Sequence, residues 1–220
     1  MPFRSVFHQL LTEESTIAWV VFGLVALTML TALVLSRWRR RRGREPSRRL
    51  EANKLEIGYL AVLSGIVAFL MVTSLTGNSK ELPNPAKPAL RVQVTGFQWC
   101  WRFHYEGQPV TITGQCRGGP YPTLVLPAGE PVELDLTSID VIHAFWLPYL
   151  RFKMYAYPDH VNSFTTTLTQ TGRWLGRCAQ LCGLYHYDMN FYVQVVSQAA
   201  FGQFLRSHGG TVPATPAVSR

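Results

Sequence analysis

Four side chains that can bind a metal ion lie within a short segment near the C-terminal end of the chain. They are Cys178, Cys182, His186 and Met189. Thiolate and thioether sulfurs are soft ligands that suit copper, and imidazole nitrogen suits it as well. Three residues separate the cysteines, so both sulfurs can point into one small volume, to which the histidine and methionine return. A distant histidine, His143, would close the site from another strand. The spacing predicts a centre of two copper ions.

Three other kinds of site would use part of this set. A disulfide between Cys178 and Cys182 would suit an oxidising compartment, but it leaves the histidines and the methionine without a role. Zinc prefers four Cys or His ligands and has little use for methionine. A mononuclear blue-copper site uses one cysteine, two histidines and a weak axial methionine, so one cysteine would remain unexplained. The complete set therefore favours two coppers.

Several segments around these residues carry a resemblance to a known family. They read Cys-Ala-Gln-Leu-Cys-Gly-Leu-Tyr-His-Tyr-Asp-Met at 178–189, Asp-Val-Ile-His at 140–143, Thr-Gly-Phe-Gln-Trp-Cys-Trp-Arg-Phe at 95–103 and Pro-Thr-Leu-Val-Leu-Pro at 122–127. With two apolar spans, they resemble subunit II of the haem–copper cytochrome c oxidases. The resemblance implies a dinuclear copper centre called CuA, in which two thiolates bridge the coppers. The ligands it implies are the bridging Cys178 and Cys182, the terminal His143 and His186, the axial Met189 and the axial backbone carbonyl of Gln180.

The resemblance also implies a route for electrons. Cytochrome c would deliver them through Trp99 to the coppers, and they would pass to haem in subunit I, which reduces oxygen to water and translocates protons. The alternative for Trp99 is packing in the core, the role we expect for Trp101 on the same face of the strand. Asp140 either hydrogen-bonds near the site or lies on the docking rim.

One departure from the family concerns magnesium. Most relatives have Glu at the position of Gln180 and Asp at the position of Tyr155, and the Glu helps to bind Mg²⁺ at the interface with subunit I. Because Mg²⁺ prefers charged oxygen ligands, we expect the Mg²⁺ site to be missing or to rest on subunit I alone.

Two uncharged apolar stretches precede the copper ligands. Residues 17–35 and 57–75 are each about 28 Å long as helices, close to the roughly 30 Å of a bilayer core. Between them, residues 37–54 carry nine basic and two acidic side chains, a net charge of +7. Short basic loops stay in the cytoplasm. We therefore expect a multi-pass protein of a bacterial cell membrane, with both termini and the copper domain on the outer, periplasmic face.

The charges also bear on partners. Membrane insertion explains the basic run without nucleic acid, and the run can hold anionic lipid headgroups. Residues 77–220 carry 11 basic and 8 acidic side chains, so the outer part lacks an acidic excess. We hypothesise that its donor is not a strongly basic free cytochrome. A membrane-tethered cytochrome c would need less electrostatic steering.

The remaining pattern predicts a two-helix transmembrane hairpin over 1–76, a linker over 77–89, an all-β domain over 90–208 and a disordered tail over 209–220. The expected strands are 91–105, 110–113, 124–126, 132–137, 164–168 and 190–196, followed by a helix over 199–208. Their spacing suits a Greek-key barrel or sandwich, and the resemblance specifies a cupredoxin-like one. Cys100 and Cys116 would form a disulfide or remain two buried thiols.

Three other functions share some of these features. A quinol-oxidase subunit II keeps the hairpin and fold but lacks the copper ligands. A subunit of a nitric-oxide reductase-type complex can carry a CuA-like module. A membrane-anchored copper carrier exchanges single ions through Cys and His, and would not need Met189 and Trp99 together. We expect subunit II of the oxidase, working with subunit I and other oxidase subunits.

Overall fold

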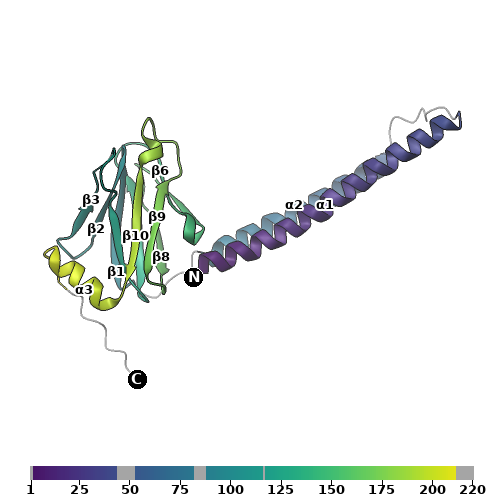
Figure 1. Ribbon diagram of the computed structural model, residues 1–220. Helices are drawn as coiled ribbons and strands as arrows, with labels where there is room; N and C mark the ends of the chain where they lie inside the picture. Colours follow the sequence, from purple (N-terminus) through teal and green to yellow (C-terminus); the bar gives the residue numbers. More distant parts are fainter. Residues whose placement is uncertain (1, 44–52, 82–87, 116, 212–220) are drawn as a thin grey trace, which may run out of the picture. The chain divides into compact units, whose positions relative to one another are not determined.

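The computed structural model describes residues 2–43, 53–81, 88–115 and 117–211. The chain folds into two compact units. One is helical and spans Ser5–Glu81, and the other contains all the β-strands of the described residues (Figure 1). The predicted order of two apolar helices followed by an all-β domain is confirmed.

The helical unit consists of α1 (Pro2–Arg41) and α2 (Asn53–Glu81). Within them, Phe7–Arg41 and Lys54–Thr76 are long and apolar enough to cross a membrane. Most of their large apolar side chains are exposed, as a lipid-facing surface requires. Polar side chains bond to their own helix instead, as when the Thr31 hydroxyl donates to the Leu27 carbonyl at 2.6 Å.

Both helices are longer than the expected spans. Helix α1 continues through Arg41, so the first basic residues of the predicted loop are helical. Helix α2 continues to Glu81, so the prediction of a linker from residue 77 was wrong at its start. Gly77 and Asn78 do not end the helix, because their weak intrinsic propensity costs only about 1 kcal/mol per residue. The rest of the loop and linker, 44–52 and 82–87, lies outside the described residues.

The β unit is a sandwich of two five-stranded sheets. The first has the order β3-β2-β1-β5-β8 and the second β4-β10-β9-β6-β7. Most neighbours are antiparallel, while β1 with β5 and β4 with β10 are parallel. The strands are β1 (Leu90–Phe97), β2 (Cys100–Tyr105), β3 (Thr111–Thr113), β4 (Thr123–Pro127), β5 (Pro131–Ser138), β6 (His143–Leu147), β7 (Phe152–Ala156), β8 (Asn162–Thr167), β9 (Gly172–Cys178) and β10 (Asn190–Val196).

Aromatic side chains fill the space between the sheets. Trp101, Phe103, Phe145 and Phe191 are fully buried, and the rings of Phe145 and Phe191 stack at 4.4 Å. Buried Tyr105 on β2 reaches the opposite sheet, where its hydroxyl donates to the Val125 carbonyl and accepts from the Val125 amide, both at 2.9 Å. This pair of bonds ties the two sheets together.

Short helices complete the unit. The turns η1 (Pro148–Leu150) and η2 (His186–Asp188) are 3₁₀-helices, and α3 (Gln198–Ser207) follows β10. The Ser197 side chain caps α3 by accepting from the Ala200 amide, and Phe201 and Leu205 bury its inner face. The helix lies within one residue of the prediction. Of the predicted tail, 212–220 lies outside the described residues, while Thr211 donates from its amide to Gln108.

Two sequence expectations about strands were wrong. The stretch 91–105 is a hairpin of β1 and β2 rather than one strand, with Gln98 and Trp99 at its turn. Trp99 therefore does not share a strand face with Trp101. Strands β6, β7 and β9 were not among the predicted strands. Lys153 in β7 and the Gly and Arg residues of β9 interrupt the alternation.

Candidate metal centre

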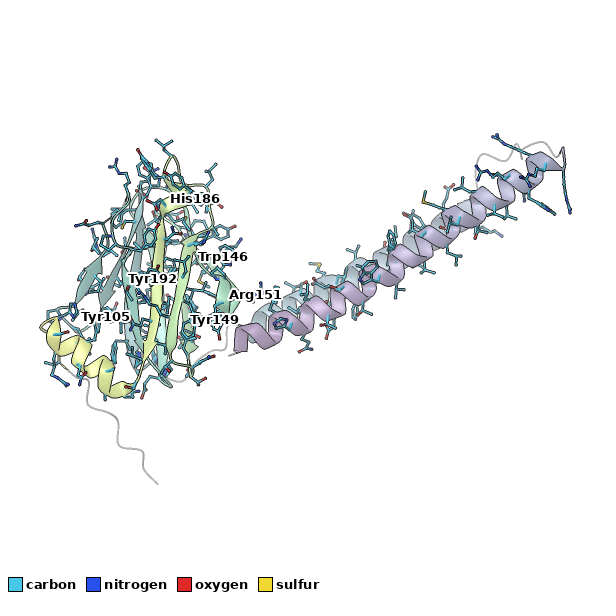
Figure 2. All side chains as sticks on the ribbon, in the orientation of Figure 1. Tyr105, Trp146, Tyr149, Arg151, His186 and Tyr192 are labelled. Carbon is cyan, nitrogen blue, oxygen red and sulfur yellow. The ribbon has the colours of Figure 1, made fainter. Side chains whose placement is uncertain are left out.

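The predicted metal-binding residues meet at one end of the sandwich. His143 begins β6, Cys178 ends β9, and the loop from β9 to β10 carries the rest. Strands β6 and β9 are antiparallel neighbours that pair Phe145 with Cys178, which brings His143 beside the loop. Figure 2 shows His186 at the end of the sandwich opposite to Tyr105.

Donor atoms from six residues gather in this small volume. The two sulfurs, Sγ of Cys178 and Sγ of Cys182, are 3.8 Å apart and both thiols are free. Around them lie His143 Nδ1 at 3.9 Å and the Gln180 carbonyl oxygen at 3.3 Å from Cys178 Sγ. On the other side lie His186 Nδ1 at 3.5 Å and Met189 Sδ at 3.8 Å from Cys182 Sγ.

These distances fit metal ligands better than a disulfide. A disulfide would hold the sulfurs about 2.05 Å apart. Two sulfurs that each lie about 2.3 Å from one metal, at a tetrahedral angle, are about 3.8 Å apart. The observed 3.8 Å separation therefore suits two sulfurs that share a metal ion. One imidazole nitrogen and one weaker donor lie beside each sulfur, a set of donors whose chemistry suits copper.

The site is largely dry. His143 is fully buried, and Cys178, Cys182 and Met189 are 7%, 3% and 1% exposed. His186 is half-buried. The surroundings of the site include the Trp101 ring, whose centroid lies 6.0 Å from that of the His143 ring. Trp101 itself packs against Phe145 and Phe191, so its surroundings are those of a core residue.

Asp140 fixes the orientation of His143. Its Oδ1 lies 2.9 Å from His143 Nε2, so a proton on Nε2 is donated to the carboxylate and Nδ1 is left facing Cys178. The carboxylate also accepts from the backbone amides of Gln98 and Val141, both at 2.6 Å. Burial raises the pKa of Asp140, but these hydrogen bonds outweigh it and hold the pKa below its usual value. Of the two roles considered from the sequence, the structure supports hydrogen bonding near the site.

The two thiols cannot both ionise easily on their own. Burial raises the pKa of Cys178, but hydrogen bonds to His143 and to the backbone of Ala144 and Gln180 bring it down to about 7. Burial and the neighbouring Cys178 thiolate raise the pKa of Cys182 to about 12. A second thiolate beside the first therefore needs added positive charge, which metal ions supply.

The turn between β1 and β2 reaches the loop from β9 to β10, residues 179–189, which we call the copper loop after the metal proposed for it. Trp99 Nε1 donates to the Cys182 carbonyl at 3.0 Å, and the Gln98 side chain donates to the same oxygen at 2.7 Å. The half-buried Trp99 ring also meets the Tyr185 ring edge-on at 4.9 Å. A Cβ on Gly183, whose φ is +114°, would lie 3.2 Å from the Trp99 ring, so glycine permits this approach.

Sequence reasoning missed Gln98 and Tyr185. Gln98 links Asp140 to the Cys182 carbonyl, and its position beside Trp99 in the aromatic segment was the available signal. Cys100 is disulfide-bonded in the structure, whereas Cys116 lies outside the described residues.

Comparisons with known proteins show which family the chain resembles. A model of the cytochrome c oxidase subunit II periplasmic domain matches residues 121–196, which include all six candidate ligands. The probable cytochrome c oxidase subunit 2 of Streptomyces avermitilis is 33% identical over 223 residues, covering 85% of this chain and 69% of that protein. The chain belongs to the cytochrome c oxidase subunit II family. The corresponding protein of Streptomyces coelicolor is 32% identical, over 73% of this chain and 63% of its own length.

The fold agrees with the family as well. The crystal structure of the periplasmic domain of subunit II of cytochrome oxidase (CoxB) from Bradyrhizobium japonicum matches with a TM-score of 0.52 and 27% identity. The match covers 56% of this chain and 96% of that domain. The predicted cupredoxin-like fold is thereby confirmed, and with the two apolar helices it describes a membrane-anchored protein with an outer domain.

Proposed function

We propose that this chain accepts electrons from cytochrome c at a dinuclear copper centre and passes them to haem in subunit I of a haem–copper oxidase. The observation that carries the proposal is the convergence of four further donor atoms on two free cysteine sulfurs that lie 3.8 Å apart. Oxygen reduction and proton translocation belong to subunit I. The chain spans between 56% and 69% of the length of the first relatives it matches, so the activity of the whole complex is part of the proposal.

In this proposal each donor has a separate task. Bound copper supplies a one-electron carrier shared between two ions. Cys178 and Cys182 would hold the copper through their thiolates, and His143 and His186 would hold it through Nδ1. The Met189 sulfur and the Gln180 carbonyl would be weaker ligands. Burial and Asp140 keep the imidazole and thiolates fixed, which limits the rearrangement that accompanies electron transfer.

Electrons enter through Trp99 in this proposal. The ring is half-buried, so one part of it reaches the surface while Nε1 contacts the backbone of the ligand Cys182. The contact supports Trp99 as the residue that connects the docked donor to the centre. A Trp held only in the core would not join the surface to the ligand loop.

The surface around the ligand loop suits a weakly charged contact. Leu181, Leu184 and Tyr187 are 78%, 74% and 75% exposed, and Ile142 beside His143 is 40% exposed. An exposed apolar patch of this kind favours docking by burial rather than by charge. It supports the hypothesis of a membrane-tethered cytochrome c as donor. The rate of donor oxidation should then depend weakly on salt, and a steep fall with rising salt would contradict the hypothesis.

The membrane arrangement is part of the proposal. Helices α1 and α2 would cross the bilayer as a hairpin, with the basic segment in the cytoplasm and both termini outside. The two helices line a common apolar groove through Ile17, Val21, Ile66 and Leu70, which supports a paired arrangement.

Magnesium binding through this chain is not part of the proposal. Tyr155 stands where relatives have an acidic ligand, and the Lys153 ammonium lies 5.4 Å from its ring. A neighbouring positive charge disfavours a divalent cation. We expect any Mg²⁺ in the complex to rest on subunit I alone.

The deciding experiment measures copper in the full chain purified in detergent. We expect two coppers per chain and an EPR hyperfine pattern from one electron shared by two copper nuclei. The variant Cys182→Ser should lose that pattern, while Tyr149→Phe, at a labelled position remote from His186 in Figure 2, should keep it. A single copper per chain would favour a blue-copper site or a copper carrier, and zinc alone would exclude electron transfer here.

A further inference from the structure

The loop between β3 and β4 is bonded to the copper loop through Asp188. This loop spans residues 114–122, of which 116 is not described. The Tyr121 hydroxyl donates to Asp188 Oδ1 at 2.6 Å, and the Gly118 amide donates to Asp188 Oδ2 at 3.0 Å. Both donors are about 70 residues away in sequence, so the bonds are tertiary contacts and not part of the local turn.

Asp188 occupies a sensitive position. It lies in η2, between the proposed ligands His186 and Met189. The Met189 amide donates to the His186 carbonyl at 3.3 Å, and the Asp188 amide donates to the Tyr185 carbonyl at 3.0 Å. No residue of η2 is buried. A single turn of 3₁₀-helix has weak hydrogen-bond geometry, so contacts from outside the turn matter for its position.

A second contact joins the same two loops on the other side of His186. The Arg117 guanidinium lies 5.2 Å from the centroid of the Tyr185 ring, within cation–π range. Tyr185 in turn packs against Trp99. The β3–β4 loop therefore contacts the copper loop at both ends of η2. One contact is at Tyr185, directly before the turn, and the other is at Asp188, its last residue.

We propose that the β3–β4 loop is a strap that positions His186 and Met189 for the copper centre, with Tyr121 and Asp188 as positioning residues. The inference rests on the proposed copper function. The Asp188 carboxylate is held by two donors and cannot rotate freely, and Asp188 lies directly before Met189 in the chain. A centre of this kind requires its ligands within about 0.5 Å of their places. Charge-assisted hydrogen bonds are strong enough to impose that restraint.

The test compares Tyr121→Phe, Asp188→Asn and the double variant in the full chain, purified in detergent and loaded with copper. The first readout is the rate of copper release to a chelator, and the second is the copper hyperfine splitting. We expect Tyr121→Phe to release copper about tenfold faster, the effect of losing one charge-assisted hydrogen bond. Asp188→Asn should release it at least as fast, because the bonds from Tyr121 and Gly118 both lose their charged acceptor. The double variant should release it little faster than Asp188→Asn, because that change already weakens the Tyr121 bond.

A matched control separates positioning from general stability. Tyr149→Phe also removes a hydroxyl that donates to a side chain, that of Gln170 at 3.0 Å, and it should change neither readout. The strap proposal is overturned if the wild-type protein holds two coppers and both single variants keep the wild-type release rate and hyperfine splitting. Variants that lose thermal stability with an unchanged copper spectrum would also overturn it. Wild-type protein without two coppers would instead overturn the proposed function, and the strap with it.

Discussion

A methyl group added at Gly96 should displace His143, one of the proposed copper ligands. A Cβ at this position would lie 2.9 Å from Cδ2, 3.1 Å from Cγ and 3.3 Å from Cβ of His143. Ordinary carbon contacts are about 3.5–4.0 Å, so about 0.6 Å of movement is needed. Strand β1 cannot supply it easily, since Gly96 pairs with Trp101 on one side and Ser138 on the other. The imidazole must therefore move.

The expected cost of Gly96→Ala has two parts. Overpacking of this kind typically costs about 1–3 kcal/mol, which lowers the melting temperature of a domain this size by about 4–12 °C. Movement of about 0.6 Å exceeds the roughly 0.5 Å within which a functional site must be held. We therefore expect copper affinity to fall by about tenfold or more.

The assay is chelator competition for copper, with thermal unfolding of the copper-free chain measured alongside. Gly210→Ala is the matched control, because its Cβ would also meet a neighbour at 2.9 Å, but that neighbour is the end of the Gln108 side chain. The control should leave copper affinity unchanged. If Gly96→Ala binds copper as tightly as wild type, the ring is not held where the contacts place it and the reasoning is refuted.

Three further predictions follow from other contacts. Trp99→Phe should keep both coppers but slow their reduction by cytochrome c at least about tenfold, since the bond to the Cys182 carbonyl is lost; stopped-flow reduction measures this. Tyr105→Phe should lower the free energy of unfolding by about 1–3 kcal/mol, because both buried backbone groups of Val125 lose their partner; denaturant titration measures it. Copper should stabilise the folded chain when free copper is about 100 times its dissociation constant. Removing that copper with a chelator should then lower the melting temperature by about 10 °C, which calorimetry measures.

The fold was predictable where the sequence pattern was regular. The two apolar spans and strands such as β5 and β10 follow from unbroken hydrophobicity or clean alternation. Strand β9 breaks that rule with two glycines and two arginines, and it is a strand because β10 and β6 pair with it on both sides. The turn at Gln98 and Trp99 was hidden, because aromatic residues continue on both sides of it.

The candidate site was predictable to the extent that its ligands are local. Cys178 to Met189 lie within one short segment, so residue type and spacing suffice to gather them. The supporting contacts are not local. Asp140 meets the amide of Gln98 from 42 residues away, and Asp188 meets Tyr121 from 67. Such partners depend on how the sheets stack, which no short pattern records.

The backbone carbonyl and the side chain of Gln180 have separate consequences for metal binding. Its carbonyl oxygen lies 3.3 Å from Cys178 Sγ, so the backbone brings an axial donor to the site whatever the side chain is. The path of that backbone is fixed independently, since the Ala179 amide donates to Ala144 and the Cys178 amide to Met189, both at 3.0 Å. A neutral side chain at this position therefore leaves the copper donors intact. The Gln180 side chain carries no charged oxygen of the kind that Mg²⁺ prefers, so we expect no Mg²⁺ ligand from it.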